Sequence, residues 1–168
     1  MFRLINSILM VCFVFLVGYF FGVKEVRFYE VISGSMEPTL KVNDRIMTIK
    51  KTGFPRKSIV MIRDPLASDE ILAKRIIGLP GETIEIKNGK VYIDGRKLRE
   101  PYIKEAPDYK LKKEIPEHHY FLLGDNRNRS EDSSVWGPVD EELIMSKAIL
   151  KYWPFKEFKI VARPSIDI

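Results

Sequence analysis

The stretch "ETIEIKNGKVYIDGRKL", residues 82–98, decides the fold class. Its apolar residues alternate with polar ones, a pattern typical of strands with one buried face. Asn88-Gly89 separates two such runs, and this dipeptide is a strong signal for a two-residue hairpin turn. Asp94-Gly95 marks a second turn shortly afterwards. The stretch therefore predicts two successive turns in an antiparallel sheet.

The flanking sequence extends this pattern. Short runs rich in Ile and Val occupy 45–51, 58–63 and 71–79, and Gly, Pro, Asn or Asp interrupt them. With 168 residues the chain has the length of about one domain. We therefore expect a mainly β domain over residues 24–168.

Two regions break the strand pattern. The region 96–117 is crowded with Lys, Glu and Pro, which predicts a solvent-exposed excursion outside the core. The stretch "VDEELIMSKAILKYW", residues 139–153, begins with acidic residues and contains one short helical pattern before Pro154.

The N-terminal stretch "LINSILMVCFVFLVGYFFGV", residues 4–23, contains no charged residue. A helix of this length spans about 30 Å, the thickness of a bilayer's hydrocarbon core. A cleaved signal peptide is the alternative, but its apolar part is about 7 to 15 residues long and ends in small residues. Here the run is longer and ends in aromatic residues that suit a membrane interface. We predict a transmembrane anchor over residues 1–23, whose orientation the flanking charges do not fix.

The composition excludes several kinds of site. The formal net charge is +5 with both signs spread along the chain, which fits a neighbouring anionic lipid surface as well as nucleic acid. The single cysteine, Cys12, lies in the apolar run, so the polar region can form neither a disulfide nor a thiolate metal site. His118 and His119 are adjacent and lack metal-ligand spacing. No metal and no cofactor are expected.

The stretch "VISGSMEPTLKVND", residues 31–44, holds two serines that are candidate nucleophiles. A serine hydroxyl needs a neighbouring base. His118 and His119 would point to opposite faces of a strand, so at most one could reach a serine, and we expect surface or strand-start positions for both. A lysine can serve instead if burial keeps it neutral, which means lowering its pKa from the usual value of about 10.4.

Lys74 in "ILAKRIIGLPGE" is the candidate base. On a strand it shares one face with Leu72 and Ile76, so it has apolar neighbours on both sides. The alternative is an exposed edge strand on which Lys74 guards against aggregation. The stretch "LLGDNRNRSEDSSVWGPV", residues 122–139, packs charges of both signs between apolar runs. Such a loop suits the orientation of a base through hydrogen bonds.

Together these segments resemble the bacterial type I signal peptidases, membrane-bound Ser/Lys serine proteases that remove signal peptides from exported preproteins. The resemblance follows the family's order and covers almost the whole chain. The matching stretches are "SGSMEPTL" (33–40) for the nucleophile box, "VNDRIMTIK" (42–50) for the next strand, "LAKRIIGLPGE" (72–82) for the lysine box, "GDNRNRSEDSSVWG" (124–137) for the final box and "MSKAILKYWPF" (145–155) for the closing strand. It implies a signal-peptidase-like β-sheet catalytic domain of the compact, single-anchor form, without the large second domain of some relatives.

The resemblance also implies roles for individual residues. Ser35 would be the nucleophile and Lys74 its neutral general base. Ser33, with the backbone N–H of Ser35, would form the oxyanion hole, and Ser130 would hydrogen-bond the Lys74 amine. None of these roles requires a cofactor.

The same likeness implies that Asp125, Arg127 and Asp132 brace the final loop, residues 124–137, by ion pairing, with Arg75 as a possible partner. Many relatives have Asp-Ser-Arg where this chain has Asp132, Ser133 and Ser134. The local basic partner of Asp132 is therefore missing, and Arg127 or Arg129 are the candidates to replace it.

The substrate pockets implied by the resemblance are shallow and apolar, because signal peptides end in small residues at the first and third positions before the cut. The residues mapped onto them are Val31, Ile32, Leu40 and Ala73. Ala73 is small where some relatives carry a larger aliphatic residue, so we expect a roomier pocket for the third position.

By the same resemblance, the catalytic domain would face the extracytoplasmic side of a bacterial cytoplasmic membrane. The expected partners are signal peptides and the lipid bilayer, and not nucleic acid. One alternative is a specialised protease that matures a single pilin or secreted substrate. Another is a catalytically idle peptide-binding module, although a binder needs neither Ser35 nor Lys74. The self-cleaving repressors share the Ser/Lys pair but are soluble and carry a DNA-binding head.

Overall fold

The computed structural model describes residues 10, 18, 25–50, 52–66 and 69–161, and in them the strands form two antiparallel sheets. The larger sheet has the order β1-β2-β11-β3-β4-β9-β10, with β12 paired to β11, and the smaller sheet has the order β7-β6-β5-β8. The strands are β1 (Val26–Glu30), β2 (Arg45–Ile49), β3 (Ile59–Arg63), β4 (Ile71–Gly78), β5 (Thr83–Lys87), β6 (Lys90–Ile93), β7 (Arg96–Lys97), β8 (Leu111–Glu114), β9 (His119–Leu123), β10 (Val139–Asp140), β11 (Ile144–Trp153) and β12 (Lys159–Ile160). The prediction of a mainly β domain is confirmed.

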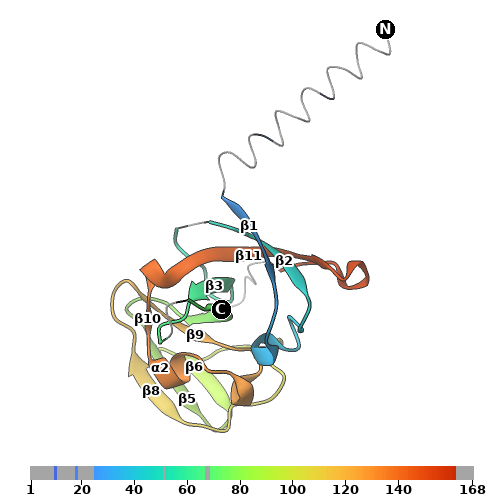
Figure 1. Cartoon of the computed structure of the whole chain (residues 1–168). Helices are drawn as coiled ribbons and strands as arrows, with labels where there is room; N and C mark the ends of the chain where they lie inside the picture. The colour runs from blue at the N-terminus through green and yellow to red at the C-terminus, as the bar shows by residue number, and fades with distance from the viewer. Residues whose placement is uncertain (1–9, 11–17, 19–24, 51, 67–68, 162–168) are drawn as a thin grey trace.

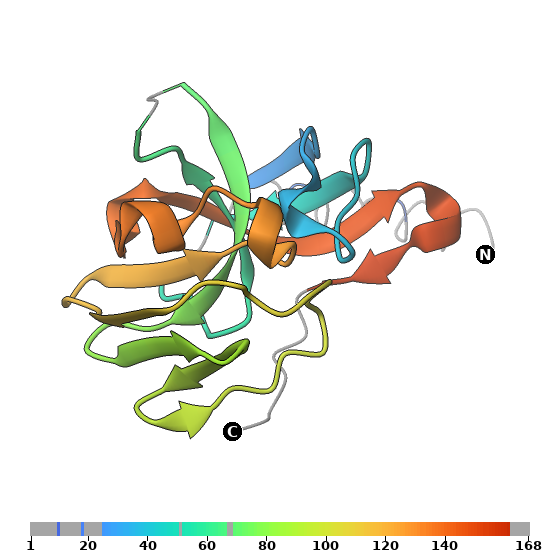
Figure 2. The same ribbon diagram turned by 90° about the horizontal axis from the view of Figure 1, so that it is seen from below.

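Short helical turns connect these strands. They are η1 (Gly34–Met36), η2 (Arg127–Arg129), α2 (Ser133–Trp136), η3 (Glu141–Leu143) and η4 (Phe155–Glu157). Although η1 and η2 are far apart in the sequence, they lie side by side in both views of the ribbon (Figures 1 and 2).

Both predicted turns of the 82–98 stretch are present. Asn88 and Gly89 have φ of 51° and 69°, the left-handed pair that a tight hairpin between β5 and β6 requires. Asp94 and Gly95, with φ of 48° and 78°, form the turn from β6 to β7. Figure 1 shows the resulting small sheet on the far side of β9 from β1 and β2.

Three apolar clusters hold the fold together. One joins the small sheet to β4 and β9, because Ile77, Phe121 and Leu123 pack against Ile84 and its neighbours. A second covers the opposite face of β3, β4 and β9 and includes buried residues such as Val60, Ile76 and Leu122. The third packs the segment around η1 onto β2, β3 and β11. The long strand β4 therefore contributes to the core on both faces.

The structure corrects the expectation for one of the two irregular segments. The region 96–117, predicted to be a solvent-exposed excursion, contains β7 and β8 and buries Ile115 at 2% exposure. In 139–153 the predicted short helical pattern is present as the single turn η3, and the ten residues of β11 follow it, in agreement with the closing strand expected at 145–155. Glu141 and Glu142 lie in η3, whereas the apolar residues after them belong to β11, which pairs with β2 and β3.

The predicted anchor at 1–23 lies outside the described residues, except for two isolated positions. Within the part of the chain that is described, no helix combines the length and the apolar character needed to cross a membrane.

Candidate active site

Ser35 lies in the turn η1, directly after β1 and the connecting residues. Met36 and Leu40 are buried at 1% and 0% exposure and fix this turn against the third apolar cluster. Gly34–Met36 form a 3₁₀ turn, and Ser33 directly before it is extended. This geometry brings the two serine hydroxyls together, with 3.2 Å between Ser33 Oγ and Ser35 Oγ.

Lys74 occupies an interior strand. β4 lies between β3 and β9, and Lys74 is opposite Val60 on the face that also carries Leu72 and Ile76. Its side chain is almost completely buried, with 3% of the residue exposed. The alternative of an exposed edge-strand lysine is therefore excluded.

Burial lowers the pKa of the Lys74 amine below its ordinary value, because a charged amine loses its hydration there. The carboxylates of Asp132, Glu131 and Asp64 act in the opposite direction and favour the charged form. Desolvation is the larger effect, so the amine is neutral at a lower pH than an exposed lysine.

The Lys74 amine has a defined partner. Nζ is 3.1 Å from the hydroxyl oxygen of Ser130 and lies 5.9 Å from the centre of the Trp136 ring. Lys74 and Ser35 line the same groove, but no hydrogen bond joins their side chains among the described residues. The amine is thus oriented by Ser130 and lines the same groove as the candidate nucleophile.

Gly124 allows the final loop to approach the serine turn. A Cβ at this position would lie 2.3 Å from Ser130 Oγ and 2.5 Å from the carbonyl oxygen of Ser35, closer than real Cβ contacts. Asn126 fixes the same approach, since its backbone N–H donates to Ser35 O at 3.0 Å and its Nδ2 donates to Gly34 O at 3.2 Å. Neither residue was predicted to belong to the site, although both lie in the polar segment 122–139.

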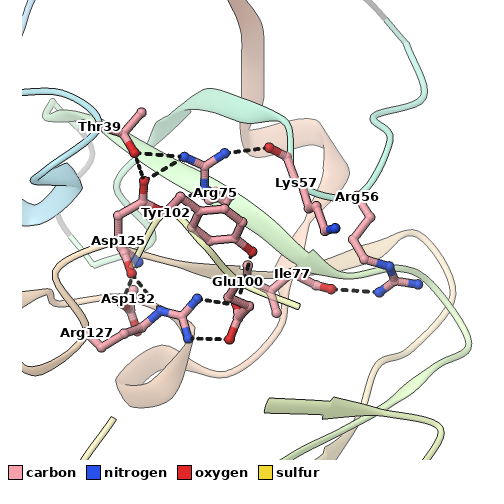
Figure 3. Close-up of polar contacts among 11 residues, drawn as sticks. Thr39, Arg56, Lys57, Arg75, Ile77, Glu100, Tyr102, Asp125, Arg127 and Asp132 are labelled. Atoms are coloured by element: carbon pink, nitrogen blue, oxygen red, sulfur yellow. Dashed lines mark hydrogen bonds and ion pairs between the residues drawn. The ribbon is translucent and has the colours of Figure 1, made fainter. Parts of the chain in front are cut away.

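Arg75, on the opposite face of β4 from Lys74, anchors the final loop through Asp125 (Figure 3). Its Nε and Nη2 donate to the two Asp125 carboxylate oxygens at 2.7 and 2.6 Å, and Nη1 donates to the carbonyl oxygen of Lys57 at 2.7 Å. Thr39, which follows η1, donates its hydroxyl to the same carboxylate. This bidentate pair joins β4, the final loop and the segment after Ser35.

Arg127 is buried at 1% exposure and pairs with Glu100, whose side chain is 5% exposed (Figure 3). Its Nε donates to the Gly124 carbonyl oxygen at 2.9 Å. Tyr102 donates its hydroxyl to Glu100 at 3.1 Å, and the guanidinium carbon of Arg75 lies 4.0 Å from the centre of the Tyr102 ring. Burial raises the pKa of Tyr102, so its hydroxyl remains a donor.

Glu100 and Tyr102 come from the region that the sequence predicted to be exposed, and they were not predicted as part of the site. Their local sequence resembles that of an exposed loop. The two arginines that they contact are distant in the sequence, and only the fold brings them close.

Asp132 does not form the ion pair expected for it. Among the described ion pairs Arg127 binds Glu100, and Asp132 binds no arginine. Its Oδ2 accepts the Gly124 N–H at 2.8 Å, and its Oδ1 accepts the backbone N–H and the hydroxyl of Ser134. Asp132 thus caps α2 and holds Gly124, and Ser134 takes the place of the missing arginine as its local donor.

The predicted pocket residues fall into two groups. Val31, Leu40 and Ala73 pack together in the third apolar cluster, at the base of the serine turn, whereas Ile32 is 81% exposed. The histidines behave as expected, with His118 exposed and His119 at the start of β9. In the described part of the chain no group of histidine, cysteine and acidic residues could hold a metal ion.

A groove joins the candidate residues. Its lining consists of Ser33, Gly34, Ser35, Glu37, Asp64, Glu70, Leu72, Lys74, Lys104, Asn126, Arg129, Glu131 and Trp136. Two buried polar atoms of this lining have no hydrogen-bond partner among the described residues, the acceptor Asn126 Oδ1 and the donor Trp136 Nε1. The residues of the lining therefore combine two unpaired polar atoms with the Ser35 hydroxyl and the buried Lys74 amine.

Comparisons with known proteins agree with this geometry. The family model described as "Signal peptidase, peptidase S26" matches residues 1–153. Signal peptidase I of Leptolyngbya laminosa is 39% identical over 145 residues, which cover 79% of this chain and 70% of the relative. Signal peptidase IB of Staphylococcus aureus (strain MRSA252) is 33% identical over 184 residues, which cover 96% of each chain.

A solved structure is also similar to this chain. The crystal structure of a signal peptidase I from Enterococcus faecalis V583 matches with a TM-score of 0.53 and 32% identity, covering 57% of this chain and 97% of that chain. Because the family match extends over most of the sequence and the relatives exceed 30% identity, this chain belongs to the signal peptidase family, peptidase S26, and is a serine endopeptidase.

Proposed function

We propose that this protein removes N-terminal signal peptides from exported preproteins, with Ser35 as nucleophile and Lys74 as general base. The observation that carries the assignment is the burial of the Lys74 amine, 3% exposed, hydrogen-bonded to Ser130 and lining the same groove as Ser35. A neutral lysine is the kind of base that a serine nucleophile needs when no histidine is near.

The proposed reaction runs through an acyl-enzyme. Ser35 Oγ attacks the scissile carbonyl carbon while its proton moves to Lys74 Nζ. The C–N bond then breaks, and Lys74 returns the proton to the leaving amine. In the second half Lys74 takes a proton from water, the hydroxide attacks the acyl carbon, and Ser35 leaves with the proton restored. General-base assistance of this kind contributes about 10² to 10⁴ in rate.

The oxyanion that forms in each half needs preorganised donors. In our proposal the backbone N–H of Ser35 and the hydroxyl of Ser33 supply them. Ser33 Oγ lies 3.2 Å from Ser35 Oγ, so its hydroxyl is already beside the atom that attacks. Substrate binding would turn this hydroxyl from Ser35 towards the carbonyl oxygen.

The groove also suits an extended peptide. The unpaired acceptor Asn126 Oδ1 and the unpaired donor Trp136 Nε1 match the N–H and C=O groups of a peptide backbone. Ile32, which is exposed, and Ala73, which is partly buried, would contact the small side chains before the cut, whereas Val31 and Leu40 lie beneath them at 7% and 0% exposure. The short side chain of Ala73 leaves space for a larger residue at the third position.

We further propose that residues 1–23 anchor the peptidase domain, residues 24–168, on the extracytoplasmic side of the bacterial cytoplasmic membrane. The uncharged run at 4–23 supports the anchor. The exposed aromatic residues Trp153, Phe155 and Phe158 support a bilayer beside the domain, because such side chains favour the lipid interface.

The decisive experiment measures cleavage of a preprotein by the detergent-solubilised full chain and by its Ser35→Ala and Lys74→Ala variants. Both variants should lose nearly all activity and keep the fold, as judged by circular dichroism. His118→Ala and His119→Ala are the matched controls for a histidine base and should retain activity. Wild-type rates in Ser35→Ala or Lys74→Ala would refute the proposal. Cleavage of several unrelated preproteins would exclude a specialised protease, and an inactive wild-type chain would favour the idle binding module.

A further inference from the structure

Three carboxylates border the groove that contains Ser35 and Lys74. Asp64 follows β3, Glu70 precedes β4, and the two are adjacent, since the Asp64 N–H donates to the Glu70 carbonyl oxygen at 2.9 Å. Glu131 joins them from the final loop, next to Ser130. None of the three forms an ion pair among the described residues.

The other charges of the groove leave this acidic border uncompensated. Glu37 is paired with Lys104 at 3.1 Å, which cancels both charges. Arg129 is then the single cation in the lining besides Lys74, which acts in its neutral form. The border formed by Asp64, Glu70 and Glu131 therefore carries excess negative charge.

The negative charge of this acidic border works against the proposed role of Lys74 as a general base. A general base must be neutral before it can accept a proton, and negative charges nearby favour the protonated lysine. Of the carboxylates around Lys74, Asp132 already accepts hydrogen bonds from the backbone N–H groups of Gly124 and Ser134. Asp64 accepts one backbone N–H, from Leu66, and no side-chain hydrogen bond of Glu70 or Glu131 is present in the described region. A bound cation would cancel their effect on Lys74.

Asn126 gives an independent indication of the ligand. It is 4% exposed, lines the same groove, and has its Nδ2 committed to the Gly34 carbonyl oxygen. Its Oδ1 is buried without a partner in the described residues, and a buried acceptor without a donor is destabilising because it has lost its hydration. Asn126 Oδ1 therefore lacks a hydrogen-bond donor. The three carboxylates likewise attract a group that carries donors, namely a cation.

We propose that Asp64, Glu70 and Glu131 form a subsite for a basic side chain of the substrate near the scissile bond, and that Asn126 Oδ1 accepts an N–H of the same peptide. The inference rests on the proposed function and adds a charge preference to it. Occupation of the subsite cancels the negative charge beside Lys74, so binding of the basic residue also favours the neutral base.

The test uses the full chain in detergent and a set of signal-peptide substrates that differ at one position. Each position flanking the cut is Lys, Gln or Glu in turn, with small residues kept at the first and third positions before it. At one of these positions wild type should cleave the Lys substrate with several-fold higher kcat/KM than the Glu substrate. The preference should shrink at high salt, because exposed charges are screened.

Glu70→Gln and Glu131→Gln should each reduce this preference about threefold, as expected for a partly exposed ion pair, and the double variant should nearly abolish it. Glu131→Gln should also shift the rise of kcat with pH to lower pH for a Gln substrate, since one carboxylate beside Lys74 is gone. Glu114→Gln on β8 removes the same charge far from the groove and should change neither property.

Two results would overturn the subsite: equal cleavage of the Lys, Gln and Glu substrates at every position, or a preference that persists in the double variant. Either result leaves the protease assignment intact, because cleavage itself is observed. Failure of wild type to cleave any of the substrates would overturn the proposed function together with the subsite.

Discussion

The amine of Lys74 and the hydroxyl of Ser130 meet at 3.1 Å, although 56 positions separate the two residues in the sequence. Lys74 is held by the central strand β4, and Ser130 follows the turn η2. The contact joins the buried amine to the loop that packs against the Ser35 turn.

Replacing Ser130 by Ala should lower kcat about tenfold or more, with a smaller effect on KM. The buried amine loses its hydrogen-bond partner, and an unmet partner of this kind costs about 1 to 3 kcal/mol. Steady-state cleavage of a preprotein measures the effect. Ser130→Thr retains the hydroxyl and should recover part of the rate, whereas equal rates in wild type and Ser130→Ala would show that Ser130 does not orient the base.

The activity should rise with pH as Lys74 loses its proton. Because burial lowers the pKa of Lys74, the rise should lie below the range in which an exposed lysine titrates, and one proton should account for it. A pH profile of kcat/KM from about pH 6 to about pH 10 measures it. An activity maximum near pH 6 would indicate a different base. Lys74→Arg should be inactive at every pH, since a guanidinium stays charged.

The same group should make stability depend on pH. Between the lowered pKa of folded Lys74 and the ordinary pKa of the unfolded chain, the unfolded state binds more protons, so the free energy of unfolding increases with pH. Urea denaturation of wild type and Lys74→Met at a series of pH values isolates this contribution. An identical pH dependence in the two proteins would contradict it.

Gly124→Ala should abolish most of the activity, because the added Cβ collides with Ser130 Oγ and the Ser35 carbonyl oxygen. We expect a loss of stability of about 1 to 3 kcal/mol as the loop and the turn separate. Gly53→Ala is the control. It also replaces a glycine, one at positive φ with open space around it, and should be destabilising while it leaves kcat unchanged. Wild-type activity in Gly124→Ala would mean that the close approach is not needed.

Asp125→Asn should destabilise the protein by about 3 to 5 kcal/mol, because it leaves the Arg75 guanidinium, 7% exposed, buried without its counter-charge. Glu30→Gln breaks the Arg45–Glu30 pair, whose side chains are 52% and 49% exposed, and should cost at most about 1 kcal/mol. Denaturant unfolding of both variants compares the two pairs. Similar losses would show that the buried pair contributes no more than the exposed one.

Much of the strand structure was predictable because its signals are local. The Asn88-Gly89 and Asp94-Gly95 turns depend on a few backbone angles, and the alternation around Lys74 depends on the two-residue period of a strand. The same period placed Lys74 with Leu72 and Ile76, as observed. Ser35 was placed in the right segment, but its 3₁₀ turn was missed because Ser and Gly fit many loop conformations.

The sequence by itself therefore determined the fold class, the identity of the candidate hydroxyl and amine, and the family, since each depends on residue type and short-range order. Only the tertiary structure decided that Lys74 is buried, that Arg127 pairs with Glu100, and that Ser134 serves Asp132 in place of an arginine. These contacts join residues that are brought together by sheet packing or by the path of a loop. Ion pairing has no sequence period, so a charged residue in a polar segment looks the same whether its partner is water or a buried guanidinium.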